Sequence, residues 1–420
     1  IRDSEGKRHS LNDPRVHLLI PSMMDRGSRA MAALFRKAGI REDAVPDPTE
    51  VDFRLGQGYT SGKECLPIII TAGSLLRYLR ERKDPDELLV YFMPGDSGPC
   101  RFGSYYLLLQ NMVERMGVPN VAFLNLSQED GYVGFSTQTT LNLWRIIILT
   151  DILEQVYAAI LVTARDRDSA LKVYNDFYDE LLLSIEREPW PRVRRLLRAG
   201  AERLAAIPRK AGLDSVPKVA LINEMYVRRN NFARQHVVEK LADKGVVTLV
   251  GTLHEWLFYV DHMVRRKLVQ NATLANRVQK VVEYLPKRLM ERGIKRLLAG
   301  TGLYEVRHAD VRRVLDCARG LVPETLICES ILITGITISE LIEEVDGVIS
   351  IQPFGCMPGR IAEAILATNL SERKLENARD RQLVERVMEE HPRLPFLVID
   401  VDGQVFPPIL EARFEAFLLQ

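Results

Sequence analysis

The chain has 420 residues, of which 46% are hydrophobic and 27% are charged, and its formal net charge is +1. This length and balance suit two or three ordinary globular domains, and the near-neutral charge gives no overall field that would favour nucleic acid or an anionic membrane. Five dispersed cysteines do not form a disulfide framework, so we expect a reducing, cytoplasmic setting.

The first 140 residues alternate short apolar runs with amphipathic segments. Strands are predicted at residues 15–21, 88–93 and 118–124, and helices at 26–38 and about 101–116. Apolar strands that alternate with helices predict a mostly parallel sheet covered on both faces. We therefore expect an α/β domain over residues 1–140.

Residues 141–216 carry few strand signals and strong helical periodicity, and we interpret them as a helical connector. The most apolar stretch, 141–162, is interrupted by Arg145, Asp151 and Glu154, which argues against a membrane span and favours a buried helix. Residues 187–210 are rich in arginine. They indicate either a solvated helix face or a docking surface for an acidic partner or ligand phosphates.

Strand–helix alternation resumes from residue 217. Strands are predicted at 218–222, 246–250, 347–352 and 395–401, and helices at 231–244, 254–267, 358–368 and 409–420. Residues 217–420 are thus a second α/β domain. The predicted fold is α/β, with two open parallel-sheet units of Rossmann or flavodoxin type joined by a helical segment.

Three cysteines stand in similar local settings: Cys65 in GKECLP, Cys100 in GPCRFG and Cys356 in PFGCMPG. Each has a proline within two residues and a glycine within three, and each precedes a predicted helix. A helix N-terminus stabilises a thiolate. Cys100 and Cys356 also follow predicted strands closely, and open parallel sheets build their sites at the carboxyl ends of strands.

Thiolates from three distant loops are suited to an iron–sulfur cluster placed between domains. The sequence contains no Cys-x-x-Cys, which argues against a zinc ribbon, a thioredoxin-type dithiol and a ferredoxin-type cluster. Spacing alone leaves three alternatives open: a [4Fe–4S] cluster with one open iron, buried structural cysteines, and a zinc site with three cysteines.

The three cysteine motifs, together with DGQ at 402–404 and EARFEAF at 411–417, resemble those of the 2-hydroxyacyl-CoA dehydratase and benzoyl-CoA reductase superfamily. The chain is most similar to the part of acyl-CoA dehydratase activase-related proteins outside their ATPase module, and to double-cubane cluster proteins. EMYVR at 224–228 and HEWL at 254–257 add to the resemblance, which spans nearly the whole chain.

The resemblance implies that Cys65, Cys100 and Cys356 hold a [4Fe–4S] cluster, either alone or within a sulfide-bridged double cubane, [8Fe–9S]. It implies an iron–sulfur redox protein that works as a homodimer or pseudo-homodimer. An ATP-hydrolysing activase, separate or fused, would supply electrons at low potential, and an acyl-CoA or another small molecule would receive them. The chain has no Walker-type motif, so we expect it to accept these electrons. The alternative is a non-catalytic, cluster-bearing scaffold or electron relay.

The candidate catalytic residues are Glu64, Arg101 and Glu329. Arg101 follows Cys100 and is placed to offset cluster charge or to hold a carbonyl or phosphate, or else it forms an ordinary ion pair at a helix start. Glu329 is a candidate buried acid near the cluster, and Glu64 directly precedes Cys65. Asp96 and Ser97 either line the pocket or form a polar turn.

Two further cysteines are expected to pack in the core. Cys317 lies inside a helical pattern, and a free buried thiol behaves as a small hydrophobe. Cys328 precedes Glu329, and an additional ligand or gate role is its alternative. The chain begins at Ile1 without Met, so we expect a processed product or part of a longer polypeptide.

Overall fold

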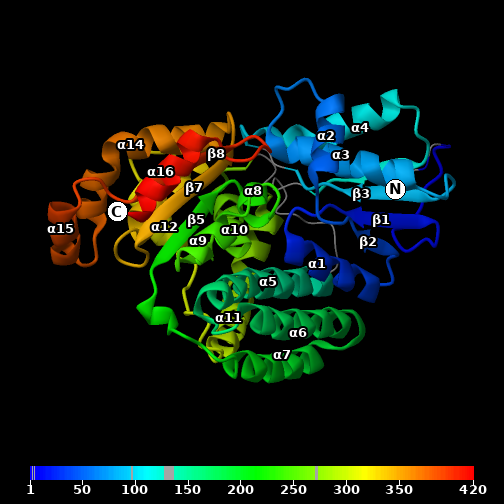
Figure 1. Cartoon of the computed structure of the whole chain (residues 1–420). Helices are drawn as coiled ribbons and strands as arrows, with labels where there is room; N and C mark the ends of the chain where they lie inside the picture. The colour runs from blue at the N-terminus through cyan, green and yellow to red at the C-terminus, as the bar shows by residue number, and fades with distance from the viewer. Residues whose placement is uncertain (2, 4, 96–97, 127–136, 270–272) are drawn as a thin grey trace.

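Two four-stranded parallel sheets organise the computed structural model, each flanked by helices (Figure 1). The structure describes residues 1, 3, 5–95, 98–126, 137–269 and 273–420. The strand orders are β2-β1-β3-β4 and β6-β5-β7-β8, so the two sheets share one flavodoxin-like topology. The predicted fold class is confirmed.

The first sheet lies in the N-terminal unit. Its strands are β1 (Val16–Ile20), β2 (Glu42–Ala44), β3 (Leu88–Phe92) and β4 (Val121–Leu124). Its helices are α1 (Asp25–Lys37), α2 (Glu50–Tyr59), α3 (Leu66–Glu81), the 3₁₀ turn η1 (Arg101–Ser104) and α4 (Tyr105–Arg115). Every residue of β1 and β3 is buried, because helices cover both faces of a parallel sheet.

Helices α2 and α3 cross in backbone contact, and two glycines make this approach feasible. A Cβ added at Gly73 would lie 1.6 Å from the carbonyl oxygen of Asp52, and one at Gly56 would lie 1.8 Å from that of Ile69. No side chain fits at either distance. The crossing therefore fixes α3, the helix that begins directly after Cys65.

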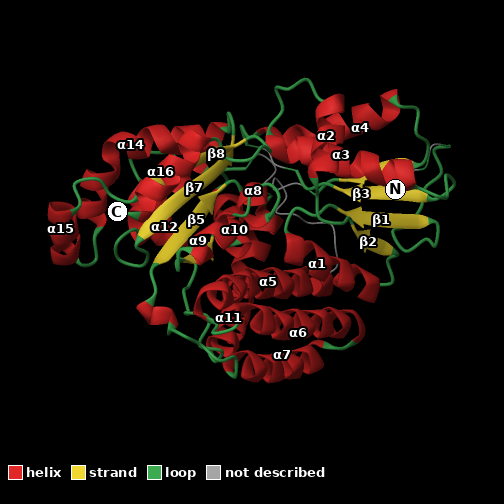
Figure 2. Ribbon diagram, viewed as in Figure 1, coloured by secondary structure: helices red, strands yellow, loops and turns green. Residues whose placement is uncertain are grey.

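The second sheet repeats this plan in the C-terminal unit. Its strands are β5 (Lys218–Asn223), β6 (Val247–Val250), β7 (Gly347–Pro353) and β8 (Phe396–Val401). Its helices are α8 (Met225–Arg229), α9 (Val237–Asp243), α10 (Leu253–Arg266), α12 (Val311–Ala318), α13 (Ser330–Glu340), α14 (Met357–Asn377), α15 (Arg381–Glu390) and α16 (Pro408–Leu418). Figure 2 shows the two sheets side by side.

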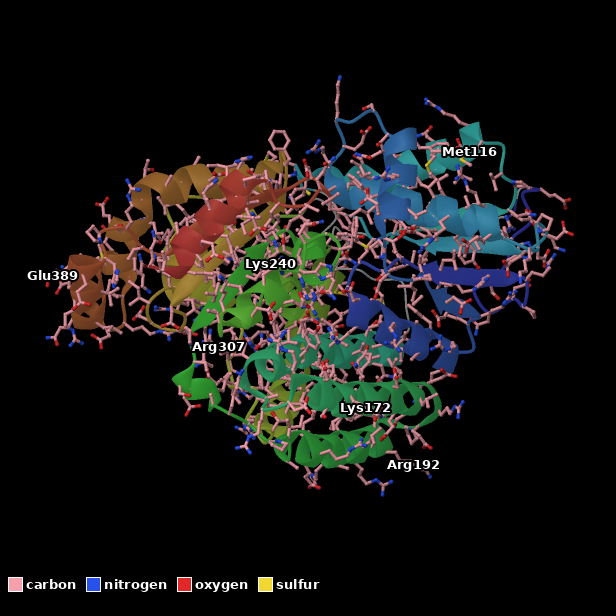
Figure 3. The ribbon with its side chains drawn as sticks, in the orientation of Figure 1. Met116, Lys172, Arg192, Lys240, Arg307 and Glu389 are labelled. Carbon is pink, nitrogen blue, oxygen red and sulfur yellow. The ribbon has the colours of Figure 1, made fainter. Side chains whose placement is uncertain are left out.

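Below both sheets lies a layer of long helices: α5 (Thr137–Thr163), α6 (Arg167–Arg187), α7 (Trp190–Ala205) and α11 (Leu274–Ala299) (Figure 1). Helix α11 joins this layer from far along the chain and packs on α5 and α7. The arginine-rich stretch runs along α7. There Arg192 pairs with Glu188 at 2.6 Å and points outward at the lower edge of the molecule (Figure 3).

Helix α5 has the length and apolar composition of a membrane span, yet 83% of its most apolar window is buried inside the structure. Its two acidic residues explain how an apolar helix can carry charge in the core. Asp151 pairs with Arg229 and with His254, at 2.5 and 2.7 Å. Glu154 pairs with Arg26 of the N-terminal unit at 2.8 Å and with Arg234 of the C-terminal unit at 2.9 Å.

These ion pairs keep both α5 carboxyls charged. Burial alone would raise the pKa of Glu154, but the guanidinium groups of Arg26 and Arg234 outweigh burial and lower it to about 2. Glu154 thereby ties the N-terminal unit, the helical layer and the C-terminal unit together.

One predicted helix is shorter than expected. The helix predicted at 231–244 begins only at Val237, because Gln235 and His236 adopt positive φ angles of 51° and 56°. The preceding turn directs Arg234 inward toward Glu154. The long-range ion pair overrides the local helical pattern here.

Candidate metal centre

Each of the three motif cysteines occupies the N-cap position of a helix. Cys65 caps α3, Cys100 caps η1 ahead of α4, and Cys356 caps α14, all with extended backbone. Pro67 and Pro358 occupy the first turns of α3 and α14, where the missing N–H is harmless. The predicted relation between cysteine, proline and helix start is therefore present in all three loops.

Arg101 joins the three cysteine loops. It follows Cys100, and its guanidinium donates one hydrogen bond to the carbonyl of Lys63 at 2.5 Å and another to the carbonyl of Gly355 at 3.1 Å. These carbonyls belong to the loops of Cys65 and Cys356. The contacts thus bring together segments that lie up to 254 residues apart.

The sulfur atoms share one partly buried neighbourhood. Cys65 and Cys356 are 8% and 7% exposed, while Cys100 is half-buried. The Sγ of Cys65 lies 2.6 Å from the Oη of Tyr105, the residue that begins α4. Burial raises the pKa of Tyr105, and the neighbouring Cys65 and Cys100 add to the rise; burial likewise raises the pKa of Cys356, and Cys65 adds to that rise. All three thiols therefore belong to one electrostatic environment.

Burial raises the pKa of the Cys65 thiol, against the Tyr105 hydrogen bond and the charge of Arg101, which lower it. Burial also raises the pKa of the Cys356 thiol; a backbone hydrogen bond from Gly359 opposes this rise, and nearby carboxyls add to it. Both thiols are thus protonated in the metal-free chain at neutral pH. Metal binding would release these protons.

The carboxyls that act on Cys356 are Glu224 and Glu329. Glu224 caps α8, accepting hydrogen bonds from the backbone N–H groups of Tyr226 and Val227 at 3.2 and 2.7 Å. Glu224 begins the EMYVR segment at 224–228, but the sequence alone does not assign it to the site. Its signal was its position directly after a buried strand, at the carboxyl edge of the sheet.

The two candidate catalytic acids, Glu329 and Glu64, face different surroundings. Glu329 lies 3.7 Å from Arg228 and borders the cavity beside the cysteines. Glu64 instead closes its own loop, accepting hydrogen bonds from the backbone N–H groups of Ser61 and Lys63 at 2.9 and 3.1 Å. This geometry gives Glu64 a role in shaping the Cys65 loop. Asp96 and Ser97 lie outside the described residues.

The remaining cysteines are buried, at 2% exposure for Cys317 and 1% for Cys328. Cys317 lies in α12 within an apolar cluster under the second sheet. The Sγ of Cys328 donates to Ser330 at 3.2 Å, and Ser330 in turn donates to the carbonyl of Pro358 at 2.7 Å. Cys328 therefore supports the first turn of the helix that Cys356 caps.

A cavity of about 240 Å³ opens beside Cys100, and residues at the carboxyl ends of strands from both sheets line it, including Ile20, Phe92 and Glu224. Its lining is mostly apolar and includes Met23, Phe102 and Trp256, with Cys100 and Glu329 among its few polar groups. A smaller cavity of about 20 Å³ adjoins Glu329 and Arg228 and has room for a single water molecule.

The donor set can be tested against the two kinds of metal group. Among the described residues, no three His, Cys, Asp or Glu side chains are close enough to hold a single metal ion. A zinc ion needs its ligands in one tight tetrahedron, whereas a cubane takes each thiolate on a different iron and accepts wider spacing. Three thiols at three helix N-caps are the donor type that a cubane takes, with one thiolate on each of three irons.

Comparison with known proteins found neither a protein-family model nor a curated protein that matches this chain.

Proposed function

We propose that the chain is an iron–sulfur redox protein in which Cys65, Cys100 and Cys356 hold a [4Fe–4S] cluster. The observation that carries this proposal is the pair of hydrogen bonds from Arg101, which draws the three cysteine loops together. The alternative of separate structural cysteines does not account for three helix N-caps converging on one guanidinium. When bound, such a cluster transfers single electrons at a potential set by its surroundings.

The residues around the thiols support this assignment. Three helix N-termini favour negative charge at the sulfurs, and the charge of Arg101 opposes the burial that raises the pKa of Cys65, so both suit an anionic inorganic group. Gly355, with a φ of +72°, turns the chain so that its carbonyl meets Arg101 and its neighbour caps α14. The apolar cavity beside Cys100 gives an electron acceptor a place close to the centre, which favours an enzyme over a pure relay.

The electron source and acceptor follow from the motif resemblance. We propose that an ATP-hydrolysing activase, separate or fused, delivers low-potential electrons to this chain, and that an acyl-CoA or another small molecule receives them. Glu329, at the border of both cavities, is the group best placed to exchange a proton with such an acceptor. A sulfide-bridged double cubane across two chains would use the same three cysteines.

The first test is iron and acid-labile sulfide content after anaerobic purification or reconstitution. We expect about four irons per chain for a cubane. Replacing Cys65, Cys100 or Cys356 with serine should remove most of this iron and its visible absorbance. Cys317→Ser is the matched control, because Cys317 is also a buried free thiol but lies within α12, outside the three cysteine loops.

Wild-type protein with fewer than about three irons per chain contradicts the cubane. Equal iron in the wild type and all three motif variants contradicts the ligand assignment. A loaded chain that turns over no acceptor with activase, ATP and reductant would instead support the relay alternative.

A further inference from the structure

Helix α11 buries charged side chains and exposes apolar ones, the reverse of an ordinary surface helix. Its charged residues Lys280, Lys287, Glu291 and Lys295 are at most 5% exposed. They form internal ion pairs, with Lys287 2.8 Å from Asp261 and Lys295 2.6 Å from Glu291. Surface helices normally bury an apolar stripe and expose their charges.

The outward face of the same helix is apolar. Six large side chains are 54% to 72% exposed there: Leu274, Val278, Val281, Val282, Leu285 and Leu289. Their spacing of one, three and four residues places them in one stripe, which we call the α11 stripe. Each adds on the order of 100 Å² of apolar surface, so the stripe totals roughly 600 Å². This matches the largest apolar patches on monomers, which are often interaction sites.

We propose that a second copy of this chain covers the α11 stripe, with the two α11 helices packed antiparallel about a two-fold axis between Val281 and Val282. The six positions are symmetric about this point. Reversing the helix sets Leu274 opposite Leu289, Val278 opposite Leu285, and Val281 opposite Val282. A two-fold interface must be self-complementary in this way.

The charges that flank the stripe favour the antiparallel direction. Exposed Arg292 and Arg296 follow the stripe toward the C-terminal end of α11. Parallel pairing would set these arginines beside their own copies and align the two helix dipoles. Antiparallel pairing separates the arginines and opposes the dipoles.

The exposed apolar area of the α11 stripe is large enough for a dimer interface. Roughly 600 Å² of apolar surface per chain approaches the ~800 Å² per partner of a standard interface, before the flanking polar rim is added. The inner face of α11 contributes Lys280 and Lys287 to the wall of the large cavity, so pairing would brace that wall from outside. The motif resemblance implies a dimer without saying which surface forms it; the new inference is that surface, the α11 stripe, and it does not depend on a bound cluster.

Sedimentation velocity over a concentration series tests the pairing. We expect a wild-type dimer and, for Leu285→Glu, at least a tenfold weaker association with unchanged circular dichroism. Ile409→Glu is the matched control, because Ile409 is 71% exposed on α16, away from the stripe. A wild-type monomer up to about 100 μM, well above the ~1 μM dissociation constant of a modest complex, overturns the proposal. So does a Leu285→Glu variant that dimerises as well as the control.

Disulfide trapping tests the direction. The double variant Leu274→Cys/Leu289→Cys should form a covalent dimer under mild oxidation. Leu274→Cys alone should not, because antiparallel pairing holds the two copies of residue 274 about 22 Å apart. Cross-linking of the single variant would show parallel pairing and refute the two-fold arrangement. Monomer that binds phosphatidylcholine–phosphatidylserine vesicles through the stripe would assign the face to a membrane and overturn the proposal.

Discussion

Arg101→Met removes the contact that joins the three cysteine loops. The wild-type side chain donates two charge-assisted hydrogen bonds, to the carbonyls of Lys63 and Gly355. Arg101 is exposed, so each bond contributes about 0.5–1.5 kcal/mol, the range for an ordinary hydrogen bond and below that for buried charged groups. Together they stabilise the assembled site by about 1–3 kcal/mol.

If the cluster requires the assembled loops, this loss appears as weaker retention of iron. A free energy of 1–3 kcal/mol corresponds to roughly 5- to 150-fold. The assay measures iron release from the anaerobically loaded protein to a chelator, with the decay of visible absorbance as the readout. Arg101→Lys should recover part of the effect, because an ammonium group keeps the charge but lacks the fork that reaches both carbonyls.

Arg360→Met is the matched control. Arg360 follows Cys356 by one turn of α14. Its two hydrogen bonds reach Glu363 at 2.7 Å and Asp400 at 2.6 Å, and its guanidinium lies 5.9 Å from the Phe354 ring, but it does not join one cysteine loop to another. We expect its iron release to stay within about threefold of wild type, as for other surface substitutions. Wild-type retention in Arg101→Met, or equal loss in Arg360→Met, would refute the reasoning.

Four further predictions concern stability, each measured by urea unfolding. Glu154→Gln should destabilise the fold by about 3–5 kcal/mol, because it leaves a buried guanidinium uncompensated. In the wild type, the low pKa of Glu154, about 2, contributes stability that is full above about pH 5 and lost as pH falls from about 4.5 to 2; a flat acid limb in the wild type would contradict this. Gly73→Ala should cost about 1–3 kcal/mol by pushing α2 off α3, whereas an unchanged midpoint would mean that the helices separate freely. Tyr105→Phe should cost about 1 kcal/mol by leaving the buried Cys65 thiol without its hydroxyl partner, and no loss would argue against that contact.

The sequence predicts the elements whose cause is local. The runs that become β1 and β3, VHLLI and LLVYF, are apolar apart from His17, as expected of parallel strands covered on both faces. Strand β2 has no such signal, because its three residues read EDA and pair only with the edge of β1. The position of α11 beside α5 could not be predicted either, because it depends on packing between distant segments.

At the candidate site, too, the sequence predicts local features but not contacts between distant segments. Local proline and glycine placement predicts that Cys65 and Cys356 begin helices. The contact between Arg101 and Gly355 joins residues 254 positions apart and carries no local pattern. The contribution of Glu224 likewise depends on where α8 lies relative to the α14 cap, which the strand order of the second sheet determines.

The central claim is that three distant thiols share one inorganic group, and anomalous diffraction at the iron edge from anaerobically grown crystals tests it most directly. We expect an iron peak bounded by the sulfurs of Cys65, Cys100 and Cys356. Loaded protein whose iron peak lies elsewhere, or which shows none between these sulfurs, would contradict it.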